Sequence, residues 1–152
     1  MSDGFAVDVK IDEKALQMKL ENLIDAKTML EVHKTFEKMC VPYVPMDEGI
    51  LVSTTQVTPE YVRYTQPYAH YMYVGEVYGP NIPMKDKDGN IIGWRSPKDK
   101  DKYPTGRQIH YNTEKHMLAS KEWDKAMMAA QGEEFTQAVK DILVRRAKEL
   151  YG

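Results

Sequence analysis

The sequence predicts an α+β fold in which a long N-terminal helix and C-terminal helices pack on a small, mostly antiparallel sheet with a long extended loop. Apolar residues recur at helical spacing near both ends of the chain, whereas β-branched residues and tyrosines concentrate between them. The resulting order is strand, helix, strands, long loop, strand and helices, which is typical of α+β domains. The chain fits one domain, residues 1–152, with residues 79–106 as an excursion from it.

The N-terminal region changes from strand-like to helical spacing. Val7, Val9 and Ile11 alternate with charged residues, which predicts a short strand or an extended arm. Asp12 is then placed to cap a helix over residues 13–40, because its carboxylate can accept a hydrogen bond from the first helical turn. That segment contains neither proline nor glycine.

The apolar residues of this helical segment form two stripes on nearly opposite faces. One stripe contains Leu16, Leu20, Leu23 and Leu30, and the other contains Met29, Val32, Phe36, Met39 and Cys40. A bend near residues 25–28, or two shorter helices, would explain both stripes. A straight helix with one face on its own core and the other on a neighbouring subunit would explain them too. The candidate subunit interface is then Met29, Val32 and Phe36.

Two prolines and then two strand-like segments follow the helix. Pro42 and Pro45 end it, because proline cannot donate a backbone hydrogen bond. Residues 50–57 and 60–65 are rich in β-branched residues and tyrosine, which predicts an antiparallel hairpin. Residues 66–74 are compatible with a short helix or another strand.

Residues 79–106 mix prolines, glycines and charges of both signs, which predicts a long loop outside the core. Within it, residues 84–94 predict a small hairpin that turns at residues 88–90. We expect the segment to be mobile in an isolated subunit and ordered in an assembly, because its few apolar residues cannot offset the entropy of ordering. A solvated charged loop is the simplest interpretation. For a docking loop, the candidate contact residues are Lys85, Arg95, Lys98 and Lys102.

The C-terminal region predicts one more strand and two helices. Residues 108–113 alternate like a strand. Ser120 can cap a short helix that contains Trp123 and ends at Gly132. The last helix is predicted over residues 133–150, where apolar residues recur at helical spacing.

The composition limits the classes of function. Lys and Arg number 21 against 23 Asp and Glu, and the net charge of −2 excludes a strongly basic nucleic-acid-binding protein. Cys40 is the only cysteine, which excludes an intrachain disulfide and favours a reducing compartment. No signal peptide or membrane-spanning run is recognisable, so we expect a soluble intracellular protein. Ten tyrosines and ten methionines favour a partner surface.

Motifs that carry chemistry are weak in this sequence. Residues 86–90 resemble the start of a calcium-binding loop, but Ile91 stands where the loop needs glycine and Pro97 where it needs glutamate. The histidines have no cysteine or carboxylate at ligand spacing, and Ser53 has no nucleophile elbow around it. We therefore expect no catalytic, cofactor-binding or metal-binding residues, no cofactor and no enzymatic activity.

Two segments, residues 44–51 (VPMDEGIL) and 67–75 (PYAHYMYVG), form a pairing that resembles a known family. It is similar to the minor capsid and neck proteins of long-tailed bacteriophages, also described as tail-completion or head–tail joining proteins. Residues 109–116, Trp123 and the C-terminal helix extend the resemblance over nearly the whole chain. The chain departs from the family pattern at Glu48, where threonine is usual, and at Met117, where proline would fit. The matching structural positions are Asp47, Gly49, Tyr68, Ala69, Tyr71 and Gly75.

The resemblance implies a structural subunit that forms a homo-oligomeric ring and joins the tail to the DNA-filled head. Its implied partners are itself, other neck, connector and tail-tube proteins, and DNA contacted non-specifically in the channel, with no membrane. The implied location is the head–tail junction of the virion, after assembly in the host cytoplasm. The alternatives are a tail terminator or other minor capsid protein, an unrelated α+β interaction domain, and an enzyme or nucleic-acid-acting factor whose residues converge only in the fold.

Overall fold

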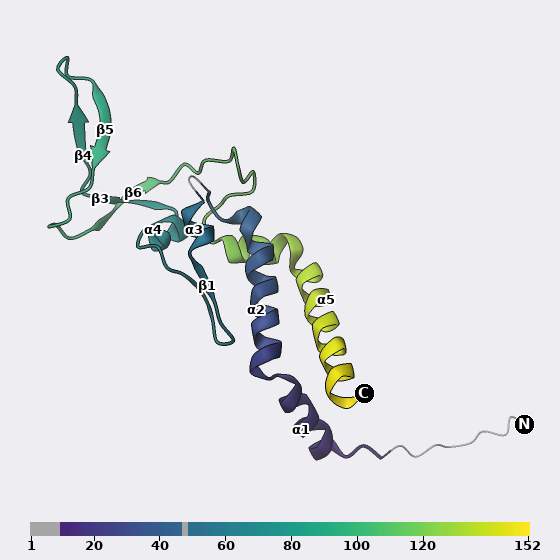
Figure 1. Cartoon of the computed structure of the whole chain (residues 1–152). Coiled ribbons are helices and arrows are strands. Elements are labelled where there is room, and N and C mark those ends of the chain that lie inside the picture. The colour runs from purple at the N-terminus through teal and green to yellow at the C-terminus, as the bar shows by residue number, and fades with distance from the viewer. Residues whose placement is uncertain (1–9, 47–48) are drawn as a thin grey trace, which may run out of the picture.

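A computed structural model describes residues 10–46 and 49–152 and confirms the α+β prediction. These residues form five α-helices, one short 3-10 helix and six strands. The strands do not join into one small sheet as expected. They form three separate antiparallel pairs, β1 with β2, β3 with β6 and β4 with β5. Figure 1 shows an elongated molecule, with α1, α2 and α5 toward one end, α3 and α4 beside the strands in the middle, and the β4–β5 hairpin projecting from the opposite end.

The predicted N-terminal helix is two helices, so the bend is confirmed and the straight helix is wrong. Helix α1 (Glu13–Leu23) begins after Asp12, whose carboxylate accepts a 3.0 Å hydrogen bond from the amide of Ala15. Asp25 caps α2 (Ala26–Cys40) in the same way and accepts a 2.8 Å bond from Thr28. A second cap within the segment divides it because the capping residue itself has non-helical backbone. The predicted strand over Val7, Val9 and Ile11 lies mostly outside the described residues.

The hairpin predicted over residues 50–65 is shorter than expected. After the 3-10 helix η1 (Val41–Tyr43), residues Ile50–Ser53 form helix α3 instead of a strand. The hydroxyl groups of Ser53 and Thr54 donate to the carbonyl of Ile50, so local bonds favour a helical turn there. Only β1 (Thr55–Val57) and β2 (Val62–Tyr64) pair as a hairpin.

Residues 66–74 contain a helix, α4 (Ala69–Val74), and not a strand. Gly75 ends it with a φ of 79°, a left-handed conformation that glycine adopts without steric cost. Strand β3 (Glu76–Gly79) follows and pairs with β6 (Tyr103–Gln108). The strand predicted at residues 108–113 is observed five residues earlier, as β6, because the pairing with β3 determines which residues of this segment are in a strand.

The hairpin within the excursion is confirmed. Strands β4 (Ile82–Lys85) and β5 (Ile91–Arg95) pair on either side of the predicted turn. The carboxylate of Asp86 accepts hydrogen bonds from the amides of Asp88 and Asn90, at 2.9 and 2.8 Å. These bonds, first the one from Asn90, hold the pKa of Asp86 below its usual value. The carboxylate therefore stabilises a turn.

The two predicted C-terminal helices are one kinked helix, α5 (Trp123–Tyr151). Gln131 has a non-helical φ of −132°, beside the glycine where a break was expected, and Figure 1 shows the change in direction. Ser120 is not the cap, because its amide donates to the carbonyl of Tyr43 and the capping position is Glu122.

The core lies where the end of α2, η1, α3, α4 and the start of α5 meet. Its buried residues are Cys40, Tyr43, Val44, Leu51, Ala69, Trp123 and Met127. Large apolar side chains outside this core are exposed, among them residues of α1 and of the β4–β5 hairpin.

Candidate functional site

The β4–β5 hairpin, residues 82–95, is a projecting apolar arm. It extends away from the rest of the chain (Figure 1). Its exposed apolar side chains are Ile82, Met84, Ile91, Ile92 and Trp94. The most exposed are Ile92 at 68% and Trp94 at 55%. A two-stranded hairpin that is not covered by another layer is only marginally stable in water, so this surface is suited to a partner.

The four candidate docking residues are not equivalent in the structure. Lys85 and Arg95 lie on the strands of the arm, opposite Ile91 and Ile82. Lys98 and Lys102 lie between β5 and β6, outside the arm. The ammonium group of Lys102 donates to Ser96 and, at 3.2 Å, to the carbonyl of Pro97, so it is held within its own loop. The arm itself therefore presents Lys85 and Arg95.

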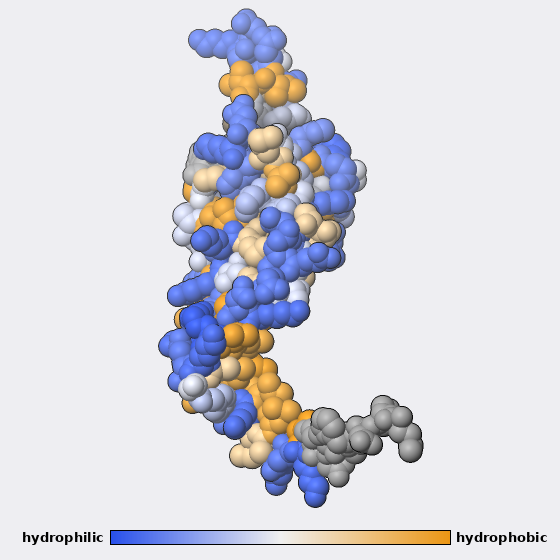
Figure 2. Space-filling model, turned by 90° about the vertical axis from the view of Figure 1, so that its right-hand side faces the viewer, coloured by the Kyte–Doolittle hydropathy of each residue, from blue (hydrophilic) through white to orange (hydrophobic). Residues whose placement is uncertain are grey.

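A second exposed apolar surface lies on α1. The α1 stripe consists of Leu16, Leu20 and Ile24, which are 49%, 51% and 58% exposed. Leu23 is the only buried residue of this helix. Figure 2 shows hydrophobic residues gathered in the lower part of the molecule, at the height of α1 and the end of α5. The sequence had placed these leucines in a stripe but did not indicate that they stay uncovered.

Attachment of α1 to the rest of the chain depends on few contacts. The Tyr151 hydroxyl donates a 2.9 Å hydrogen bond to the carbonyl of Lys19. The ammonium group of Lys19 also lies 5.3 Å from the centre of the Tyr151 ring. An isolated helix of this length is marginal in water, so a partner on the α1 stripe would stabilise it.

The candidate interface residues Met29, Val32 and Phe36 are half-buried on α2. The Phe36 ring meets the Phe135 ring edge-to-face, with centres 5.5 Å apart. Val32 and Phe36 also line a shallow groove of about 360 Å³ with Phe135. The chain itself therefore uses part of this stripe, and its contact with a neighbour stays a prediction.

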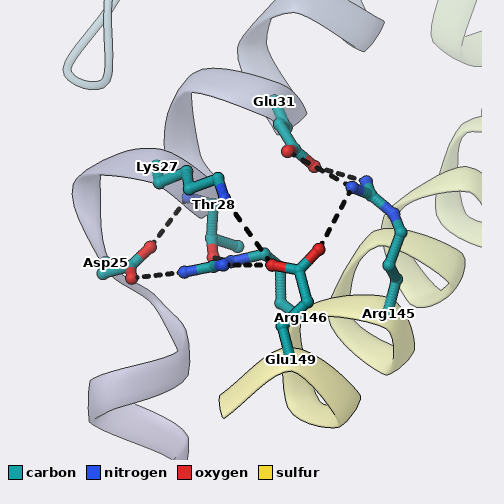
Figure 3. A network of polar contacts seen from close by, with 7 residues as sticks. All are labelled: Asp25, Lys27, Thr28, Glu31, Arg145, Arg146 and Glu149. Carbon is teal, nitrogen blue, oxygen red and sulfur yellow. Dashed lines mark hydrogen bonds and ion pairs between the residues drawn. The ribbon is translucent and has the colours of Figure 1, made fainter.

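A buried arginine joins the bend between α1 and α2 to α5 (Figure 3). Arg146 is 5% exposed, and its guanidinium donates to the Thr28 hydroxyl at 3.2 Å and to the Asp25 carboxylate at 2.7 Å. It also donates to Glu149, one turn along α5. Asp25 thus caps α2 and binds α5 at the same time, which fixes the direction of α1 relative to these two helices.

These contacts lower the pKa of both carboxylates. The backbone hydrogen bond from Thr28, more than the contact with Arg146, lowers the pKa of Asp25. The hydrogen bond from Arg146 lowers the pKa of Glu149. The sequence gives no signal for the role of Arg146, because nothing local connects it to a residue 121 positions earlier.

The positions of the family-like motif have structural roles where they are described. Asp47 lies outside the described residues, and so does the departure at Glu48. Gly49 precedes α3 with a φ of 80°. Ala69 is in the core and the Tyr71 ring packs 4.7 Å from the Tyr78 ring. Tyr68, immediately before α4, is partly exposed, and Gly75 ends that helix.

The single cysteine is buried, two of the four histidines are hydrogen-bonded, and His70 and His110 are exposed. Burial raises the pKa of the Cys40 thiol to about 12, so it is protonated at neutral pH. The Nδ1 atoms of His33 and His116 each lie 2.7 Å from a backbone carbonyl oxygen. Residues 10–46 and 49–152 contain no group of three side chains that could hold a metal ion. Over the same residues, no helix is long and apolar enough to cross a bilayer.

Fold and surfaces together define an elongated α+β chain with uncovered apolar side chains at both ends. Comparison with family models, curated proteins and solved structures finds no match to this chain.

We expect the backbone amides of the arm to exchange with solvent much faster than those of α5 in the isolated subunit. The reason is that no second layer covers the hairpin, so its hydrogen bonds open locally. Hydrogen exchange followed by mass spectrometry would measure this, with the peptides of β1–β2 as the reference for a hairpin beside the core. Protection of the arm equal to that of α5 would contradict the expectation.

Proposed function

We propose that this chain is a structural subunit of the head–tail junction of a long-tailed bacteriophage. Copies of it form a ring that joins the tail to the DNA-filled head. The observation that carries the proposal is the exposure of large apolar side chains at both ends of one small chain, on the arm and on the α1 stripe. Contiguous apolar surface of this kind is typical of sites that bind another protein.

The arrangement of these surfaces supports a closed assembly. The arm and the α1 stripe lie at opposite ends of the molecule (Figure 1) and differ in structure, one being a hairpin and the other a helix face. Contacts between unlike surfaces are heterologous, and they produce a ring when the rotation between copies closes. The likeness of residues 44–51 and 67–75 to phage neck proteins provides the biological setting for such a ring.

A catalytic function has less support. The Cys40 thiol is buried and protonated, and the imidazoles of His33 and His116 bond to backbone carbonyls. No described feature activates a nucleophile in the manner that covalent catalysis requires.

The test is a phage that carries a nonsense codon at Tyr68, grown in a host without a suppressor and examined by electron microscopy. We expect DNA-filled heads and complete tails that do not join, and a loss of infectious particles. Supplying the intact gene from a plasmid should restore joined particles. Normal infectious particles without the protein would refute the proposal, and the absence of any heads would move its role to an earlier step of assembly.

A further inference from the structure

Two apolar surfaces of unlike shape are left uncovered on each copy, and one chain cannot bring them together. The arm projects from one end of the molecule and α1 lies at the other (Figure 1). We propose that the arm of one copy binds the α1 stripe of the next copy, so that copies join head to tail. This inference rests on the proposed ring and identifies the two surfaces that form its subunit contact.

The arm presents an apolar face of the right kind. Trp94 pairs across the strands with Pro83, and Ile91 pairs with Lys85. Pro83 and Lys85 alternate along β4, so these four side chains lie on one face of the hairpin. Ile92 has no cross-strand partner at the irregularity between Met84 and Lys85 and is exposed beside them. Exposed tryptophan and isoleucine side chains on a narrow hairpin can insert beside a helix, and tryptophan is enriched among residues that dominate interface energies.

Leu16, Leu20 and Ile24 offer the matching surface. They follow one another at four-residue spacing along α1 and its C-cap, which aligns them on one side of the helix. One flank of the stripe is covered by the chain itself, because Leu23 is buried and Lys19 contacts Tyr151. The other flank is open to solvent.

The charges beside the two surfaces are complementary. On the arm, Lys85 lies on the Trp94 face, whereas Arg95 pairs with Ile82 on the opposite face and Asp86 and Asp88 lie in the turn. On α1, Glu13 and Glu21 each stand three residues before a member of the stripe, which places them next to it. Within the described residues, neither Lys85 nor these two glutamates take part in an ion pair.

The occupant to which we assign the stripe is the arm of a second copy, because Lys85 on the Trp94 face can meet Glu13 or Glu21 beside the stripe. A pair of α1 stripes is the competing arrangement, and the cross-linking experiment separates the two.

Disulfide cross-linking between two singly substituted chains tests the contact. Leu20→Cys and Ile92→Cys proteins would be purified separately, mixed and oxidised. We expect a disulfide-linked pair that contains one chain of each kind, and no linked pair from either chain alone. Cys40 does not interfere, because it is fully buried. The matched control is Met117→Cys mixed with Ile92→Cys, since Met117 is exposed, apolar and outside both surfaces.

Charge reversal provides an independent test of the same contact. We expect Lys85→Glu or Glu21→Arg alone to reduce the cross-linking yield by about tenfold, because like charges then face each other. Combining the two reversals on the facing surfaces should restore the yield. Circular dichroism of each variant verifies that it is folded.

Several outcomes would overturn the inference, and they separate it from the proposed ring. Linkage of Leu20→Cys to itself would indicate paired α1 helices. Equal linkage to Met117→Cys would indicate random collision. No linkage, while the unsubstituted protein sediments as an oligomer, would refute the arm–stripe contact and leave the ring intact. A protein that is monomeric at every concentration would refute both.

Discussion

Replacing Trp123 with alanine should lower the free energy of unfolding by about 3–5 kcal/mol, the range measured when a buried tryptophan is truncated. Trp123 is 2% exposed and begins α5. Its ring meets those of Tyr64 and Tyr73 edge-to-face, with centres 5.0 and 5.1 Å apart. Truncation removes both contacts and leaves a cavity between α4, β2 and α5. Scanning calorimetry should show a fall of roughly 10 °C in the unfolding midpoint.

The second tryptophan of the chain is the matched control. Trp94 lies on the arm and is 55% exposed, so Trp94→Ala should change the free energy of unfolding by no more than about 0.5 kcal/mol. The same variant should lose assembly if the arm is a docking surface. Equal destabilisation by both substitutions would show that the arm belongs to the cooperative core, contrary to its position in the fold.

Replacing Arg146 with leucine should destabilise the fold and make it less sensitive to acid. The substitution removes the group that binds Asp25, Thr28 and Glu149 together (Figure 3). Truncating one partner of a buried ionic contact is costly because the remaining polar groups lose their hydrogen bonds. We expect the thermal midpoint at neutral pH to fall by several degrees.

The pH dependence has a definite sign. The pKa values of Asp25 and Glu149 are lower in the folded chain than their ordinary values. Their contribution to stability is therefore present above the ordinary carboxylate pKa, near 4, and is lost as the pH falls through the lowered values. Urea unfolding from pH 7 to pH 3 should show a smaller loss of stability in Arg146→Leu than in the unsubstituted protein.

The adjacent Arg145 supplies the control. Its guanidinium is exposed and pairs with Glu31 at 2.5 Å. Arg145→Leu should have a smaller effect at neutral pH, because an exposed ion pair contributes little. If the two substitutions had equal effects, the buried network would not be what fixes the bend to α5.

Local signals in the sequence predicted several elements of the fold. Asp12 at the start of α1, Gly75 after α4 and the turn of the arm were all expected. Each of them acts through hydrogen bonds or backbone geometry within a few residues. The helix α3 was missed because residues 50–52 are β-branched or apolar, while the hydroxyl groups of Ser53 and Thr54 supply the bonds that favour a helical turn.

Contacts between distant segments were not predictable from the sequence. The pairing of β3 with β6 and the bond from Arg146 to Asp25 join residues that no periodic pattern relates. The sequence also could not predict which of the two apolar stripes, on α1 or on α2, would be exposed. Phe135 of α5 covers part of the α2 stripe, whereas the α1 stripe stays open because few contacts hold α1 against α5. Which apolar face meets solvent depends on where α5 ends relative to both helices.

The connections of the arm to β3 and β6 determine how the arm would transmit mechanical load to the rest of the chain. Residues 80–81 connect β3 to β4, whereas the longer segment 96–102 connects β5 to β6. Tension on the arm would therefore reach β3 before β6. Figure 1 shows the arm at a steep angle to β3 and β6, so a pull along the arm acts across this pair and not along it. A chain held by its arm would therefore yield first at the β3–β6 pair, whose hydrogen bonds open one after another, while the core stays intact.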